Sequence, residues 1–194
     1  MEVLTKRITE WLIVNKAVED GDRELYEYAI YSLMITISPL FLVLIIGIMM
    51  GTLIEGVFLI IPFMCIRKFS GGYHAKNAGT CFVSSCALLV ICMYLAAHIK
   101  YGVWVSFVAT VAIALLALFS PIDSENRRLD EEEKKLYRKI AIKISLLFML
   151  VHILLLLFKC ENWAVSVAIG LMLSAGLQLP CLLQQLNQRI QKLL

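Results

Sequence analysis

The chain has 194 residues, of which 60% are hydrophobic and 17% are charged, and its mean hydropathy is +0.82. Soluble globular domains are only about half apolar, so this composition excludes them and indicates an integral membrane protein. Each transmembrane helix needs about 20 apolar residues, so the length allows one bundle of about six helices. We expect an all-α fold with a single domain over residues 1–194. Its expected partner is the lipid bilayer, and we expect no binding of nucleic acid.

The first twenty residues mix both charge signs and lack an uninterrupted apolar core followed by small residues, so they do not resemble a signal peptide. Leu4, Ile8 and Trp11 recur at roughly helical spacing against Lys6 and Glu10. This pattern predicts an N-terminal amphipathic helix on the inner leaflet. A short cytosolic segment that packs on the bundle is the open alternative.

Six apolar runs follow, and they predict six transmembrane helices. The first two are separated by small and turn-permissive residues around Gly51, which predicts a tight hairpin. The runs cover residues 29–50, 51–66, 81–97, 103–119, 144–158 and 163–179.

The basic residues predict the orientation, because short loops rich in Lys and Arg stay in the cytoplasm. With the N-terminus inside, all of the 18 basic residues except Lys100 and Lys159 fall on the inner side. Both termini are therefore expected in the cytoplasm. The six cysteines show no paired spacing, so we expect no disulfide framework and a free thiol at the cytoplasmic Cys81.

A polar stretch, "RKFSGGYHAKNAGTC" from Arg67 to Cys81, interrupts the apolar sequence between the second and third runs. Histidine exchanges protons near neutral pH and a thiolate is a strong nucleophile, so His74 and Cys81 suggest acyl transfer. On one unbroken helix the two residues would lie about 10 Å apart along the axis. A direct pair needs a bend, for which Gly71, Gly72 and Gly79 are the candidates.

The third apolar run predicts where the thiol lies. Thr80 is the expected N-cap and Cys81 the expected first helical residue. The positive end of a helix favours the thiolate, and its unpaired N–H groups could hold a developing oxyanion.

Two other interpretations of this stretch stay open. It could be an ordinary turn in which Arg67 and Lys68 bind lipid phosphate. His74 and Cys81 could also form a metal site with Cys86, but no second paired ligand motif exists, so we expect no metal and no cofactor. His98 and His152 occur singly near the ends of apolar runs, where we expect interfacial side chains.

The pattern of Arg67, Gly71, Gly72, His74 and Cys81 resembles the AgrB family of bacterial membrane peptidases, which process the precursor of a cyclic autoinducing peptide. The similarity extends to the chain length, the six apolar runs and a later segment, "SPIDSENRRLDEEEKK", that looks like the family's cytoplasmic loop. Together these features cover nearly the whole chain.

The resemblance implies that Cys81 is the nucleophile and His74 its base, supported by Arg67, Gly71 and Gly72. It implies a cysteine endopeptidase that cleaves an AgrD-like precursor and releases its acidic tail. The enzyme would keep the rest of the peptide as a thioester, and an internal Cys or Ser would close a thiolactone or lactone ring. It also implies a homodimer in the bacterial cell membrane, with the active site at the cytoplasmic side.

The later segment offers a binding site for the acidic tail of the precursor, at Arg127, Arg128, Lys134 and Lys135. The four acidic residues at 130–133 nearly cancel this charge, so a solvated positive-inside loop is the alternative. Two other function classes also stay open. A peptide transporter or exporter is disfavoured by the few ionisable residues within the runs, and a non-catalytic membrane scaffold would need no reactive pair.

Overall fold

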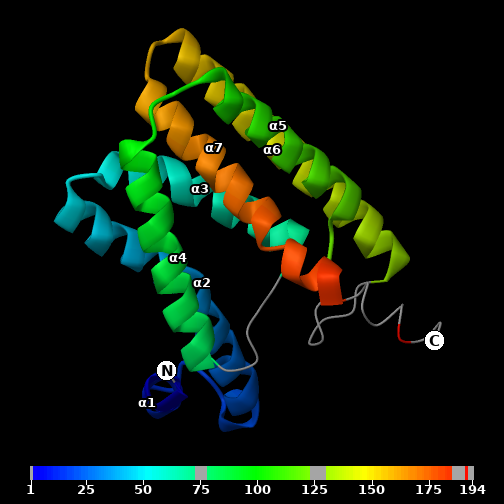
Figure 1. Cartoon of the computed structure of the whole chain (residues 1–194). Coiled ribbons are helices and arrows are strands. Elements are labelled where there is room, and N and C mark those ends of the chain that lie inside the picture. The colour runs from blue at the N-terminus through cyan, green and yellow to red at the C-terminus, as the bar shows by residue number, and fades with distance from the viewer. Residues whose placement is uncertain (1, 73–77, 123–129, 185–190, 192–194) are drawn as a thin grey trace. The chain divides into compact units, whose positions relative to one another are not determined.

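A computed structural model of the chain describes residues 2–72, 78–122, 130–184 and 191. Within these ranges the structure is all-α, with seven α-helices, one short 3-10 helix and no strand (Figure 1). The helices are α1 (Glu2–Val14), η1 (Asp20–Asp22), α2 (Arg23–Met50), α3 (Leu53–Ser70), α4 (Ala78–His98), α5 (Val103–Phe119), α6 (Glu131–Leu157) and α7 (Glu161–Gly176).

Three helical stretches are long and apolar enough to cross a membrane: Asp20–Met50, Glu131–Leu157 and Glu161–Gln184. Two shorter apolar helices, Val83–His98 and Val103–Phe119, accompany them. These helices confirm the prediction of an all-α protein with the character of a membrane protein. Six spans and two cytoplasmic termini stay predictions.

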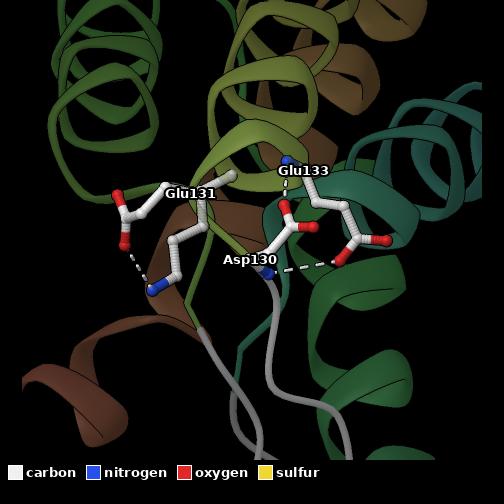
Figure 2. Close-up of polar contacts among 4 residues, drawn as sticks. Asp130, Glu131 and Glu133 are labelled. Atoms are coloured by element: carbon white, nitrogen blue, oxygen red, sulfur yellow. Dashed lines mark hydrogen bonds and ion pairs between the residues drawn. The ribbon is translucent and has the colours of Figure 1, made fainter.

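The start of α6 differs from the expectation. The segment expected as a cytoplasmic loop becomes helical at Glu131, thirteen residues before the apolar run begins. The reason is a capping box, shown in Figure 2: Glu133 N donates to Asp130 Oδ1 at 2.7 Å, and Asp130 N donates to Glu133 Oε2 at 3.3 Å. These bonds satisfy backbone groups that the first turn of a helix leaves unpaired, so charged residues can begin a helix that the apolar run continues.

The chain divides into two compact units, with the boundary between Leu42 and Val43 inside α2. In the first unit, Thr5 and Thr9 of α1 are buried, and Thr5 Oγ1 donates to Met34 Sδ at 3.9 Å. Leu4 and Trp11 are exposed, Trp11 by 64%. The helix α1 thus exposes two of its large apolar side chains, as a helix lying on a lipid surface does.

In the second unit, α7 is the central helix, with almost every residue from Ala164 to Ala175 buried. It packs against α3, α4, α5 and α6. A Cβ atom at Gly170 would overlap the carbonyl oxygen of Leu59, so α7 and α3 are in backbone contact there. The C-terminal ends of the two helices are joined further along, where Gln178 Nε2 donates to Ser70 O.

The hairpin expected around Gly51 is confirmed. Gly51 has φ +67°, and Thr52 N donates to Gly47 O at 2.8 Å while Gly51 N donates to Ile48 O at 3.4 Å. This pair of bonds is the Schellman motif, which closes a helix on a glycine in the left-handed conformation. The chain therefore reverses between α2 and α3 within two residues.

Candidate active site

The bend after α3 lies at Gly71 and Gly72, whose φ angles are +69° and +130°. A side chain would be strained in either conformation. It would also lack space, because a Cβ atom at Gly71 would overlap the carbonyl oxygen of Ile122 and one at Gly72 would overlap Arg67 Nη1. Two of the three predicted bending glycines are thus required by the backbone. Gly79 is not, since it lies within α4.

Arg67 turns back onto this bend. Its Nη1 donates to Gly71 O at 3.1 Å, and Ser70 Oγ donates to the same carbonyl at 3.3 Å. The structure therefore brings together Arg67, Gly71 and Gly72, the three residues expected to support the site. The guanidinium places a positive charge where the chain leaves α3.

A buried polar cluster, which sequence reasoning missed, holds the bend from the other side. Gln178 Nε2 donates to Ser70 O at 3.1 Å and to Ser120 Oγ at 2.8 Å, and all three residues are buried. Ile122 N also donates to Ser70 O, at 3.0 Å, and Ile122 forms a parallel bridge with Gly71. We call Ser70, Gly71, Ser120, Ile122 and Gln178 the Gln178 cluster. A glutamine in the last apolar run was the available signal, but its partners are far away in sequence.

The Gln178 cluster joins the starts of two segments that carry predicted site residues. One segment leaves α3 toward His74, and the other leaves α5 toward Arg127 and Arg128. Figure 1 shows the C-terminal ends of α3, α5 and α7 and the start of α6 at the same end of the second unit. The structure thus pairs the starts of the segments, while His74, Arg127 and Arg128 themselves lie outside the described residues.

Cys81 lies in the first turn of α4, which begins at Ala78. Thr80 is therefore helical, and its predicted role as N-cap is wrong. The preference of threonine for the N-cap does not locate the start of a helix to within three residues, because threonine also occurs inside the first helical turn. Cys81 remains the fourth residue of the helix, at the end of the first turn.

The two remaining predicted binding residues lie at the start of α6. Lys134 Nζ pairs with Glu131 Oε1 at 3.2 Å (Figure 2), and Lys135 is exposed. An exposed pair of this kind contributes little to stability, and it partly neutralises Lys134. Lys135 is thus the more available of the two for an anionic ligand.

No three His, Cys, Asp or Glu side chains gather as a metal site in the part of the chain that the structure describes. Five cysteines are free there: Cys65, Cys86, Cys92, Cys160 and Cys181. His98 is exposed and stacks on Tyr94, with ring centroids 4.1 Å apart, as an interfacial residue can.

His152 differs from the expectation of an interfacial side chain, because it is completely buried. Its Nδ1 lies 2.8 Å from Ala164 O, and its Nε2 lies 2.9 Å from Ser106 Oγ, which is 3.1 Å from Tyr101 Oη. A carbonyl only accepts, so Nδ1 carries a proton and donates to Ala164 O. Hydropathy cannot reveal such partners. We call Tyr101, Ser106, His152 and Ala164 the His152 cluster.

Comparison with known proteins finds similar chains in several bacteria. A putative AgrB-like protein of Clostridium perfringens strain SM101 is 23% identical over 94% of this chain and 90% of its own length. A putative AgrB-like protein of Listeria innocua is 29% identical over 72% of this chain and 71% of its own. The accessory gene regulator protein B of Staphylococcus saprophyticus is 23% identical over 62% of each chain.

No solved structure matches the chain. The family model for accessory gene regulator B matches residues 5–181, which include the bend at Gly71 and Gly72, Cys81, the start of α6 and Gln178. The chain therefore belongs to the accessory gene regulator B family.

Proposed function

We propose that this protein is a membrane-embedded cysteine endopeptidase that cleaves an AgrD-like precursor peptide and promotes its cyclisation. One observation carries the proposal: the bend at Gly71 and Gly72, with Arg67 folded onto it, lies between the end of α3 and the helix start that bears Cys81. Membership of the family adds the substrate class, because accessory gene regulator B acts with a precursor of the D type.

In the first half of the reaction, His74 takes the thiol proton and the Cys81 thiolate attacks the carbonyl carbon of the scissile peptide bond. Free N–H groups in the first turn of α4 stabilise the oxyanion of the tetrahedral intermediate. The intermediate collapses when the C–N bond breaks. The amine of the acidic tail leaves with the proton from His74, and the peptide stays on Cys81 as a thioester.

In the second half, an internal Cys or Ser of the peptide attacks the thioester carbonyl and gives its proton to His74. The bond to Cys81 breaks, and the protonated His74 returns a proton to the thiolate. The product is a thiolactone or lactone ring. A thioester preserves the activation of the acyl group, so a positioned internal nucleophile competes well with water.

The acidic tail is proposed to bind the basic residues Arg127, Arg128, Lys134 and Lys135. Pairing of Gly71 with Ile122 supports this, because the segments toward His74 and toward Arg127 start side by side. Glu131 partly neutralises the charge of Lys134, so Lys135 and the two arginines would provide most of the attraction for the acidic tail.

We further propose a single multi-pass domain in the bacterial cell membrane, active as a homodimer, with both termini and the site at the cytoplasmic face. The asymmetry of basic residues supports this orientation. In intact cells, cysteine labels at position 100 should react with an impermeant reagent, and labels at 76 or 134 should not. A reactive label at position 76 would show that the topology is the reverse of the one proposed, with Cys81 in an oxidising compartment.

Co-expression with a candidate precursor tests the activity. The precursor would have an amphipathic head, a core with Cys or Ser, and an acidic tail, and its products would be identified by mass. The wild-type chain should give the tail and a ring, and Cys81→Ala and His74→Ala should give neither at normal abundance. Cys86→Ala is the control, since the nucleophile model expects normal cleavage and a His74–Cys81–Cys86 metal site expects its loss. Export of an uncut peptide would indicate a transporter, and no change in the peptide would indicate a scaffold.

A further inference from the structure

Gln178 is an unusual residue for its location, because burying its amide costs free energy. It is 1% exposed and lies within the apolar helical stretch Glu161–Gln184. A buried amide without partners is costly, so buried polar groups usually find the nearest acceptor. Ser166 and Ser174 of α7 do this within their own helix, because each hydroxyl donates to the carbonyl four residues earlier at 2.9 Å. Gln178 instead donates to two segments far away in sequence.

The orientation of the Gln178 amide is determined by its partners. The carbonyl of Ser70 only accepts, so the amide nitrogen must face it, and a flipped amide would place two acceptors against each other. Nε2 uses both hydrogens, on Ser70 O and Ser120 Oγ. Oε1 is buried and has no partner among the described residues.

An unpaired buried acceptor destabilises the fold, and an apolar side chain of similar size would avoid this cost. Replacement of buried polar groups by well-packed apolar ones is often neutral or stabilising. Stability explains the bond to Ser120 Oγ, which is buried and would otherwise lose this partner. It does not explain the bond to Ser70 O, because that carbonyl already accepts from Ile122 N. The bond to Ser70 O therefore points to a further purpose.

The acceptors of these bonds suggest that purpose. Ser70 is the last residue of α3, and its carbonyl also accepts from Ile122 N. The left-handed bend at Gly71 and Gly72 begins directly after it, and His74 follows only four residues after Ser70. The amide therefore fixes the peptide group from which the chain sets out toward His74.

We propose that Gln178 is a positioning residue for the acyl transfer at Cys81. By holding Ser70 O and Ser120 Oγ, it sets the direction in which the chain leaves α3 and so the place of His74 relative to the thiol. Gln178 does not itself touch the reacting atoms. This inference rests on the proposed peptidase function.

Gln178→Leu tests the proposal, because leucine is similar in size and removes both the donated bonds and the unpaired acceptor. We expect kcat for precursor cleavage to fall ~10²-fold, the typical cost of misplacing a catalytic group by about 1 Å. KM should change much less, and the melting temperature should fall only modestly, because Ser120 Oγ loses its donor while Ser70 O keeps Ile122 N. Unchanged kcat would overturn the proposal. Loss of folded protein would also overturn it, because the amide would then serve stability.

A second measurement reports on His74 without any substrate. The alkylation rate of Cys81, mapped by mass spectrometry across pH, reflects how readily the thiolate forms beside its base. The pH profile of Cys81 alkylation in the Gln178→Leu variant should resemble the profile of the His74→Ala variant. A profile identical to wild type would show that the base has not moved and would contradict the positioning role.

Two further variants complete the experiment. Ser120→Ala removes one of the two bonds and should lower kcat by a smaller factor, with no further loss when combined with Gln178→Leu. Ser174→Ala is the matched control, because this buried hydroxyl bonds only within its own helix, and its kcat should be unchanged. If the wild-type chain cleaves no precursor, the proposed function fails; if it cleaves and Gln178→Leu cleaves equally fast, only the positioning role fails.

Discussion

The His152 cluster and the Gln178 cluster are two buried polar networks at opposite ends of α7. Each joins α7, or the residues just after it, to an end of α5. In the His152 cluster both ring nitrogens have partners. In the Gln178 cluster one acceptor, Gln178 Oε1, has no partner among the described residues, and the bonds converge on a bend with two glycines at positive φ.

This difference separates two uses of buried polar groups. A network in which both ring nitrogens are satisfied, within regular helices, can stabilise a bundle and needs no other role. A network that holds an irregular segment serves a different use, because binding and catalytic residues are often carried on loops that a rigid scaffold positions. Substitutions in the His152 cluster should therefore affect stability, and those around the Gln178 cluster should affect catalysis.

Gly72→Ala should have the largest effect. The new Cβ atom would be strained at φ +130°, would lie 3.1 Å from Leu177 O and would displace the Arg67 guanidinium from Gly71 O. We expect a loss of cleavage of at least ~10²-fold, measured as kcat on purified protein.

Gly176→Ala is the matched control for this variant. Gly176 ends α7 two residues before Gln178, and a Cβ atom there would meet nothing within 4 Å. Cleavage by Gly176→Ala should be normal. An equal loss in both variants would show that this end of the bundle tolerates no added methyl group and would remove the special role of the bend.

His152→Leu should show the opposite behaviour. It removes the bonds of the imidazole to Ala164 O and to Ser106 Oγ, and each lost bond costs about 0.5–1.5 kcal/mol, because Ser106 keeps Tyr101 as a partner. The melting temperature should fall while kcat of the folded protein stays normal. A fall in kcat without a fall in melting temperature would show that the His152 cluster also takes part in catalysis.

Asp130→Ala should have a smaller effect, limited to the start of α6. The variant loses the bond from Glu133 N, and losing an N-cap costs about 1 kcal/mol. Thermal unfolding would measure this. Glu132→Ala, with an exposed side chain outside the capping box, should change the melting temperature less. Equal shifts would mean that the charge of the first turn, rather than the cap, stabilises α6.

Lys135→Ala should have the smallest effect. If the acidic tail binds the start of α6, the variant should raise KM by less than about fivefold, as expected for a solvent-exposed ionic contact, and added salt should reduce the difference. Lys134→Ala should raise KM less, because Lys134 pairs with Glu131. A larger effect of Lys134 would place the tail on the other side of the α6 start.

The sequence predicted the helices well where apolar residues alone define them. The run at 103–119 coincides with α5, and the hairpin at Gly51 follows from the need for a left-handed residue. It predicted the start of α6 poorly, because the run marks only the apolar part of a helix that begins thirteen residues earlier, at Glu131. The Asp130–Glu133 spacing was the readable signal for this cap.

The candidate site divides in the same way. The bend at Gly71 and Gly72 could be predicted, because glycine's conformational freedom is a local property. Gln178 and the buried His152 could not, because the sequence shows neither that a polar side chain within an apolar run is buried nor which distant carbonyl it meets. Apolar periodicity carries no information about such contacts.

The most direct test of the account is to trap the acyl-enzyme. A precursor whose internal Cys or Ser is replaced by Ala cannot close its ring, so it should lose its acidic tail and stay attached to the protein or hydrolyse slowly. Mass spectrometry of the digested protein should then place the adduct on Cys81, as a thioester that hydroxylamine removes. An adduct on another cysteine, or tail release by a Cys81→Ala protein of normal abundance, would contradict the mechanism.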